Sequence, residues 1–125
     1  MGTKSYLGNP NLKGVGVSVD WTPEAVEEYK KCMESPLYFI KNYVQIVNVD
    51  RGLVKFDMWD FQEDMINHFH DERFVICKMP RQTGKSTTII SYLLHYILFN
   101  PEVNVAVLAN KGAVARELLS RLQLA

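Results

Sequence analysis

An apolar run, a short loop and a long apolar stretch follow one another over residues 73–99, and they restrict the possible folds most strongly. Residues 73–79 form a short apolar run, which predicts a strand. Residues 86–99 are apolar almost all round, which predicts a nearly buried helix. Residues 103–108 repeat the strand pattern. Strand, loop, helix and strand predict a βαβ unit, hence an α/β fold with a parallel sheet.

The loop in this unit reads Pro80-Arg81-Gln82-Thr83-Gly84-Lys85-Ser86-Thr87. Gly84 would let the backbone come close to a phosphate, and backbone amides at a helix N-terminus attract anions. We expect Lys85 to bind the β- and γ-phosphates of a nucleotide and Ser86 to bind Mg²⁺. Gln82, Thr83 and Thr87 complete the expected nucleotide-binding set, with Gln82 shaping the loop.

Plainer interpretations of the same loop remain open. The full phosphate-loop pattern has a glycine where this chain has Met79, and a Gly-Lys-Ser tripeptide occurs often by chance. Ser86 would then only cap a helix, and Lys85 would be a solvated charge. Arg81 could stabilise the γ-phosphate in the transition state, or it could be a surface arginine paired with a carboxylate.

Phe61 and Gln62 precede the loop on an expected amphipathic helix. A glutamine can hold adenine with one donated and one accepted hydrogen bond, and an aromatic neighbour can stack on the base. The alternative is that Phe61 belongs to the apolar face of the helix and Gln62 to its solvated face. We expect adenine contact because a phosphate loop follows.

The region before the loop is expected to be mostly helical. Residues 1–20 should form an irregular arm. Thr22 should cap a helix over Pro23–Glu34, and Ser35-Pro36 should start a second helix that reaches Tyr43. A hairpin over 44–56 follows, and then a helix that begins near residues 57–59 and reaches about His70. The expected organisation is therefore an arm (1–20), a helical region with a hairpin (21–56), and the start of an ATPase domain (57–125).

Composition adds little on partners, because fourteen basic and fourteen acidic side chains cancel. The longest apolar stretch is too short to cross a bilayer, so we expect a soluble intracellular protein without a membrane partner. Cys32 and Cys77 should be reduced and buried rather than disulfide-bonded. His68 and His70 should lie on the surface, and His95 should be a hydrogen-bonded core residue. Lys111 and Arg116 are candidate contacts to a nucleic-acid backbone, although a solvated turn explains them equally well.

Taken together, these segments resemble the large terminase subunit of tailed bacteriophages, of the contractile-tailed type. The resemblance covers about residues 8–125. The matching segments are Gly8-Asn9-Pro10-Asn11-Leu12-Lys13, Trp21-Thr22, Val26-Glu27-Glu28-Tyr29-Lys30-Lys31-Cys32, Phe61-Gln62-Glu63-Asp64-Met65, Arg81-Gln82-Thr83-Gly84-Lys85-Ser86 and Leu108-Ala109-Asn110-Lys111-Gly112. That family has the Arg-Gln-x-Gly-Lys-Ser/Thr form without the leading glycine, which accounts for Met79.

The resemblance implies an ATP-driven motor that moves double-stranded phage DNA into an empty capsid. It implies a RecA-like P-loop ATPase domain, ATP and Mg²⁺ as ligands, and a ring at the capsid portal with portal protein and small terminase subunit as partners, in the host cytoplasm. By position, Gln62 and Phe61 resemble the adenine contacts. Lys85 and Ser86 resemble the phosphate and magnesium residues, and Arg81 resembles the γ-phosphate sensor and catalytic arginine.

The chain departs from this family at its C-terminus, where no later apolar run ending in Asp-Glu follows. The acid that would polarise the attacking water and the nuclease carboxylates are therefore missing, so we expect an incomplete domain that hydrolyses ATP very slowly. Alternatives are a piece of another helicase-like translocase, a non-catalytic nucleotide-binding or assembly module, and a truncated product without function. A strand that leads into the loop is a condition of the motor interpretation.

Overall fold

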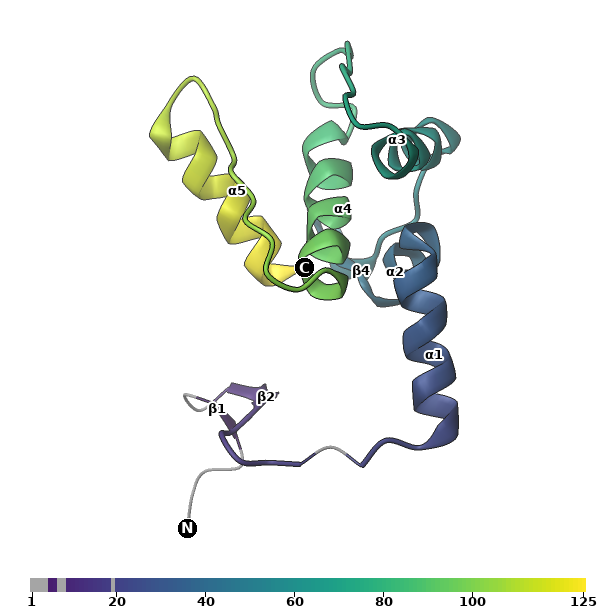
Figure 1. Ribbon diagram of the computed structural model, residues 1–125. Coiled ribbons are helices and arrows are strands. Elements are labelled where there is room, and N and C mark those ends of the chain that lie inside the picture. The colour runs from purple at the N-terminus through teal and green to yellow at the C-terminus, as the bar shows by residue number, and fades with distance from the viewer. Residues whose placement is uncertain (1–4, 7–8, 19) are drawn as a thin grey trace.

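The computed structural model describes residues 5–6, 9–18 and 20–125, and within them the chain is mainly helical (Figure 1). The helices are α1 (Pro23–Glu34), α2 (Pro36–Tyr43), α3 (Asp60–Asp71), α4 (Lys85–Phe99) and α5 (Gly112–Leu124). The strands form two separate antiparallel pairs, β1 (Ser5–Tyr6) with β2 (Asn9–Lys13) and β3 (Gln45–Asn48) with β4 (Gly52–Lys55).

Local capping bonds determine where α1 and α2 begin. The hydroxyl of Thr22 accepts a hydrogen bond from the N–H of Ala25 at 3.2 Å. Ser35 ends α1 by donating its N–H to the carbonyl of Lys31 at 3.1 Å, and its hydroxyl starts α2 by accepting from the N–H of Tyr38 at 3.2 Å. Both predicted helices are confirmed. Ser35 alone connects the two helices and caps both of them, which restricts the angle between α1 and α2.

A carboxylate also joins these two helices. One oxygen of Glu28 on α1 accepts hydrogen bonds from the hydroxyls of Tyr38 at 2.7 Å and Tyr43 at 2.8 Å on α2. These bonds lower the pKa of the Glu28 carboxyl. The bond to Glu28 raises the pKa of the Tyr43 hydroxyl to about 12, with burial as a smaller cause.

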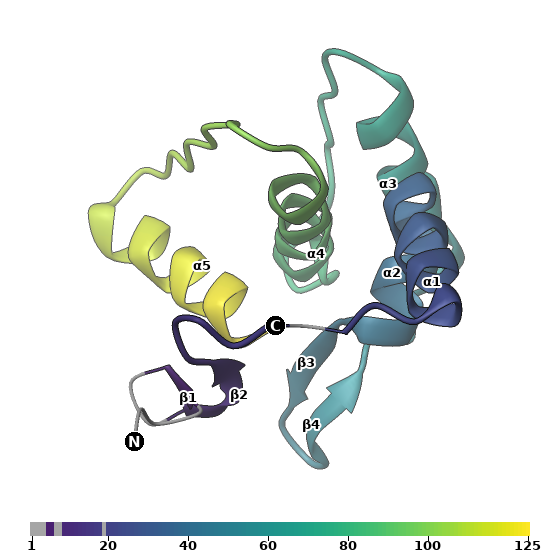
Figure 2. The same ribbon diagram turned by 60° about the horizontal axis from the view of Figure 1, so that its bottom comes forward.

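The predicted hairpin is confirmed as β3 and β4, in a register that pairs Gln45 with Lys55 and Asn48 with Gly52 (Figure 2). The side chain of Asn48 accepts hydrogen bonds from the next turn amides, and Gly52 has a φ of 72°. Residues 1–20 were expected to be irregular, but β1 and β2 pair within this segment. Residues 1–4, 7–8 and 19 of that expectation lie outside the described residues.

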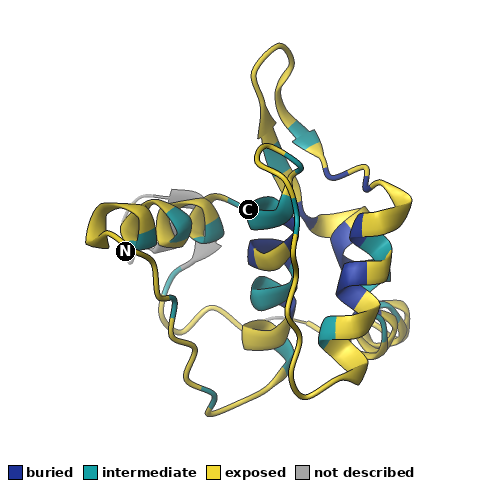
Figure 3. Cartoon of the chain, turned by 90° about the horizontal axis from the view of Figure 1, so that it is seen from above, coloured by how far each residue is buried: buried dark blue, intermediate teal, exposed yellow. Residues whose placement is uncertain are grey.

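The core lies between the side chains of α1, α2, α3 and α4. Figure 3 shows buried positions on α4 and on helices that pack beside it. Ile40 and Ile66 are fully buried. The buried cluster consists of Cys32, Phe39, Ile40, Val44, Phe56, Met58 and Ile66. By contrast, α5 packs against α4 without burying any of its own residues.

His95 of α4 belongs to this interior, as predicted. It is 3% exposed, its Nε2–H donates to the carbonyl of Cys32 at 2.8 Å, and its ring lies beside Phe39 and Phe99. Burial lowers the pKa of the His95 imidazole, and the bond to the Cys32 carbonyl offsets part of that effect. The prediction that His68 lies on the surface is also confirmed, as it is for His70. Both cysteines are free thiols, but the prediction that Cys77 is buried is wrong.

The predicted parallel sheet is wrong, and with it the α/β P-loop fold class. Residues 73–79 and 103–108 are not strands, and all strand pairs among the described residues are antiparallel. Several of their apolar side chains are open to solvent, since Phe74 is 82%, Ile76 is 97% and Leu108 is 90% exposed. The condition of a strand leading into the loop is therefore not met.

The physical reason for this error is that a strand depends on partners that its own residues do not supply. Strand propensity expresses packing on a covered, pleated surface more than a backbone preference. A parallel pair is stable only when both of its faces are covered, and two strands alone are marginal. Here the helices α2, α3 and α5 contact α4 in place of a sheet. The prediction that α4 is nearly buried all round is consequently also wrong, because Ile89, Ile97 and Leu98 are exposed.

Candidate functional site

The loop at residues 80–84 makes a tight turn that leads directly into α4. Gly84 is the N-cap of the helix with φ 74° and ψ 12°, in the left-handed region that glycine tolerates best. Gln82 also has a positive φ of 59°. The helix begins at Lys85, one residue before the predicted start. The loop thus reverses the chain with two left-handed residues and places Lys85 and Ser86 in the first helical turn.

The side chain of Lys85 folds back over this loop. Its Nζ donates to the carbonyl of Pro80 at 3.3 Å and to that of Met79 at 3.4 Å. The hydroxyl of Thr83 donates to the same Pro80 carbonyl at 3.1 Å. The ammonium group is therefore held beside the loop backbone by acceptors that a phosphate oxygen could replace.

The start of α4 is suited electrostatically to an anion. Its first turn contains no acidic residue, and Gly84 has no side chain that could cap the helix. The first amides of a helix carry partial positive charge and lack helical acceptors. Ser86 and Thr87 are half-buried in this turn. The turn can accept a negatively charged group on its amides, with Lys85 beside it.

Arg81 and Gln82 are exposed at the tip of the loop. In the described part of the chain, the ion pairs join Lys31 to Glu28, Lys41 to Glu63 and Arg121 to Glu117. Arg81 is in none of them, so its guanidinium remains available to a ligand at the loop.

Gln62 lies beside the loop in a buried position, and not on the solvated face of α3 that the alternative interpretation gave it. It is 3% exposed, and its Nε2 donates to the hydroxyl of Thr88 at 3.0 Å and to the carbonyl of Gly84 at 3.4 Å. Its Oε1 accepts from the N–H of Trp59 at 2.9 Å. Phe61 is 41% exposed on the same helix.

Thr88 is the site residue that sequence reasoning missed. It is fully buried, and its hydroxyl donates to the Gly84 carbonyl at 2.9 Å while it accepts from Gln62. Its position four residues after Gly84 permits this local bond, which is common for threonine in helices. The contact with Gln62 spans 26 residues of sequence, and no local signal could have indicated it.

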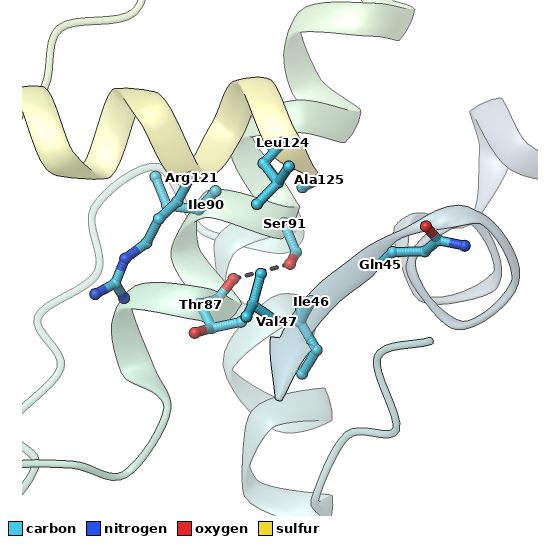
Figure 4. Close-up of a pocket in the computed structure, with 9 residues that line it drawn as sticks. All are labelled: Gln45, Ile46, Val47, Thr87, Ile90, Ser91, Arg121, Leu124 and Ala125. Carbon is cyan, nitrogen blue, oxygen red and sulfur yellow. Dashed lines mark hydrogen bonds between the residues drawn. The ribbon is translucent and has the colours of Figure 1, made fainter. Parts of the chain in front are cut away.

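A cavity of about 380 Å³ lies on another side of the same helical turn, between α4, α5 and β3 (Figure 4). Thr87, Ile90 and Ser91 line it from α4, and Ser91 donates its hydroxyl hydrogen to the carbonyl of Thr87 at 2.8 Å. Arg121 and Leu124 line it from α5. Thr87 therefore faces this space rather than the Gln62 contact.

Other sequence candidates lie away from the loop. Lys111 and Arg116 are exposed at the beginning of α5, and the two residues carry no further sign of a nucleic-acid contact. A search of residues 5–6, 9–18 and 20–125 finds no group of three or more His, Cys, Asp or Glu side chains placed to hold a metal ion. Over the same residues, no helix has both the length and the apolar character to cross a membrane. No protein-family model matches the chain.

Proposed function

We propose that this chain binds the triphosphate of ATP, together with Mg²⁺, through residues 81–87. One observation carries the proposal: Gly84 turns the backbone into a helix start without acidic residues, and the Lys85 ammonium lies over the same loop. A helix N-terminus attracts phosphate, glycine allows close approach, and lysine adds a full charge. The helix N-terminus, the glycine and the lysine together are the features that a loop needs to bind a triphosphate.

Each side chain has a role in this proposal. The Lys85 ammonium exchanges the carbonyls of Met79 and Pro80 for β- and γ-phosphate oxygens. The Ser86 hydroxyl binds Mg²⁺, as a hydroxyl at this position of a phosphate loop does. The exposed Arg81 guanidinium reaches the γ-phosphate. Gln82 and Thr83 shape the loop, whereas the side chain of Thr87 faces the cavity beside α5.

From the sequence resemblance, we further propose that the chain is the ATP-binding part of a terminase-type motor for double-stranded DNA, although residues 73–79 do not form the strand that this interpretation required before the loop. The loop geometry supports the phosphate-binding part of this proposal and not the DNA-moving part. The proposal does not include a parallel sheet. None of the proposed residues aligns a water for attack on the γ-phosphate, so we expect the chain alone to hydrolyse ATP very slowly. A non-catalytic nucleotide-binding module is the second candidate, and the loop geometry is equally compatible with it.

The binding proposal is tested by calorimetric titration of Mg·ATP into the wild-type chain and the variant Lys85→Ala. A hydrogen bond between charged groups contributes about 1.5–3 kcal/mol, so the variant should bind roughly 10- to 100-fold more weakly. Lys111→Ala is the matched control, because Lys111 is also a lysine at the start of a helix and its side chain is exposed. Equal affinities of wild type and Lys85→Ala would remove the basis of the proposal.

A single-turnover experiment with excess protein and radiolabelled ATP distinguishes the motor from the non-catalytic module by the release of phosphate. A slow release of phosphate that Lys85→Ala abolishes would favour the motor part. Binding without any release over many hours would favour the non-catalytic module.

A further inference from the structure

The buried carboxamide of Gln62 connects the start of α3 to the first turn of α4. Gln62 is the third residue of α3, and it reaches back to the N–H of Trp59, which precedes the helix. This bond fixes the orientation of the amide, because an N–H donor must face the oxygen. The nitrogen of Gln62 therefore faces α4, where Thr88 and Gly84 accept from it.

The bonds of this network converge on one backbone oxygen. The Gly84 carbonyl accepts from the N–H of Thr88 at 3.0 Å, from the Thr88 hydroxyl at 2.9 Å and from Gln62 at 3.4 Å. In a planar trans peptide the C=O and the following N–H point in opposite directions. Holding the Gly84 carbonyl on the Gln62 side therefore directs the N–H of Lys85 away from Gln62. That N–H is one of the amides that the proposed function assigns to phosphate.

The same bonds conflict with the expected adenine contact. A carboxamide nitrogen has two hydrogens, and Gln62 uses both of them toward Thr88 and Gly84. An adenine contact needs one donor and one acceptor, so the bond to Gly84 would have to break. Gln62 is also 3% exposed, whereas a base-reading side chain has to face the ligand.

We infer that Gln62 is a positioning residue that orients the Gly84–Lys85 peptide for phosphate and does not read the base. The inference rests on the proposed triphosphate site and deepens it. The ligand class becomes the Mg²⁺-bound polyphosphate chain, so adenine and guanine nucleotides are bound equally well. Thr88 acts with Gln62 through the same carbonyl.

The experiment compares the affinities of Mg·ATP, Mg·GTP and inorganic magnesium tripolyphosphate for the full chain. The variants are Gln62→Met and Thr88→Val, which keep side-chain size but remove the polar groups, and the double variant. Gln123→Met, on the exposed side of α5, is the matched control. Binding is measured well below the unfolding temperature of the least stable variant.

We expect each single variant to lose about tenfold in affinity for all three ligands, the size expected for one buried hydrogen bond. The double variant should lose no more than either single variant, because both side chains act through one carbonyl. The control should bind like wild type. Thr88→Val tests the same contact from the other helix, so the outcome does not depend on how well Gln62→Met folds.

Three results would overturn the inference. Weaker ATP binding with unchanged tripolyphosphate binding by Gln62→Met would mean that Gln62 reads the base. Fully additive losses in the double variant would mean that the two residues act separately. A lower unfolding temperature with unchanged affinities would mean a merely structural role. Failure of the proposed function gives a different result, in which wild type binds tripolyphosphate no better than Lys85→Ala.

Discussion

Replacing Gly84 by alanine should destabilise the folded chain through two separate effects. The first is the backbone: Gly84 has a φ of 74°, and a non-glycine residue in this region costs about 1–2 kcal/mol. The second is space, since a Cβ on Gly84 would lie 2.6 Å from the nitrogen of Gln62. Gln62 can swing away from the methyl group, but it then loses its bonds to Thr88 and Gly84.

The second effect can be estimated from those bonds. Each hydrogen bond contributes about 1 kcal/mol net, so displacing Gln62 costs about 1–2 kcal/mol. Gly84→Ala should therefore lose about 2–4 kcal/mol of unfolding free energy in total. For a domain of this size, about 1 kcal/mol shifts the unfolding temperature by roughly 4 °C.

Gly52 provides a matched control for the backbone effect. It has a φ of 72°, and a Cβ there would meet nothing within 4 Å. Gly52→Ala should therefore cost only about 1–2 kcal/mol, and the difference between the two variants isolates the contact with Gln62. Urea titrations followed by circular dichroism give both values. In a Gln62→Ala background, Gly84→Ala should cost no more than Gly52→Ala.

Equal destabilisation by Gly84→Ala and Gly52→Ala would refute this reasoning. The same conclusion follows if Gln62→Ala does not reduce the cost of Gly84→Ala. Either result would mean that Gln62 does not lie against Gly84 in solution, and the positioning inference would lose its geometric basis.

Three further predictions concern titratable groups. Burial lowers the pKa of His95 in the folded state, so the unfolded state binds more protons below about pH 6.5. The unfolding free energy should therefore fall as the pH decreases from there. Denaturant titrations at several pH values should show this decrease in the wild type and not in His95→Gln. Glu28→Gln should lower the pKa of Tyr43 from about 12 toward its ordinary value, as measured by ultraviolet titration of the tyrosines, and an unchanged value would contradict the hydrogen bond. The exposed thiol of Cys77 should react rapidly with a thiol reagent, whereas Cys32, whose thiol pKa is raised by burial, should react only on unfolding; Cys77→Ser should remove the fast phase.

The sequence predicted those parts of the fold that depend on near neighbours. Thr22 and Ser35 start helices through bonds to residues three positions away, and the turn before Gly52 closes a hairpin of adjacent strands. These interactions are set by local chain chemistry, so a pattern of a few residues is sufficient. Helix α3 was predicted for the same reason, although it begins at Asp60 and not within residues 57–59.

Long-range pairing was not predictable in the same way. Residues 73–79 and 103–108 have the apolar composition of strands. Whether such segments pair into a sheet depends on which other surfaces cover them. At the loop, the sequence predicted the start of α4 to within one residue, but not the positive φ of Gly84. The buried contact of Gln62 with Thr88 depends on how α3 packs on α4 and had no sequence signal.

The exposed segment at residues 73–79 reverses a common rule for interpreting mutations. Ile76 lies in the middle of a strand-like apolar run. A hydrophobicity profile would place a core residue there and predict that the position does not tolerate polar substitutions. Because its side chain is 97% open to water, exchanging it for lysine removes no buried contact. Position 76 is therefore free for a label, an affinity handle or a solubilising charge.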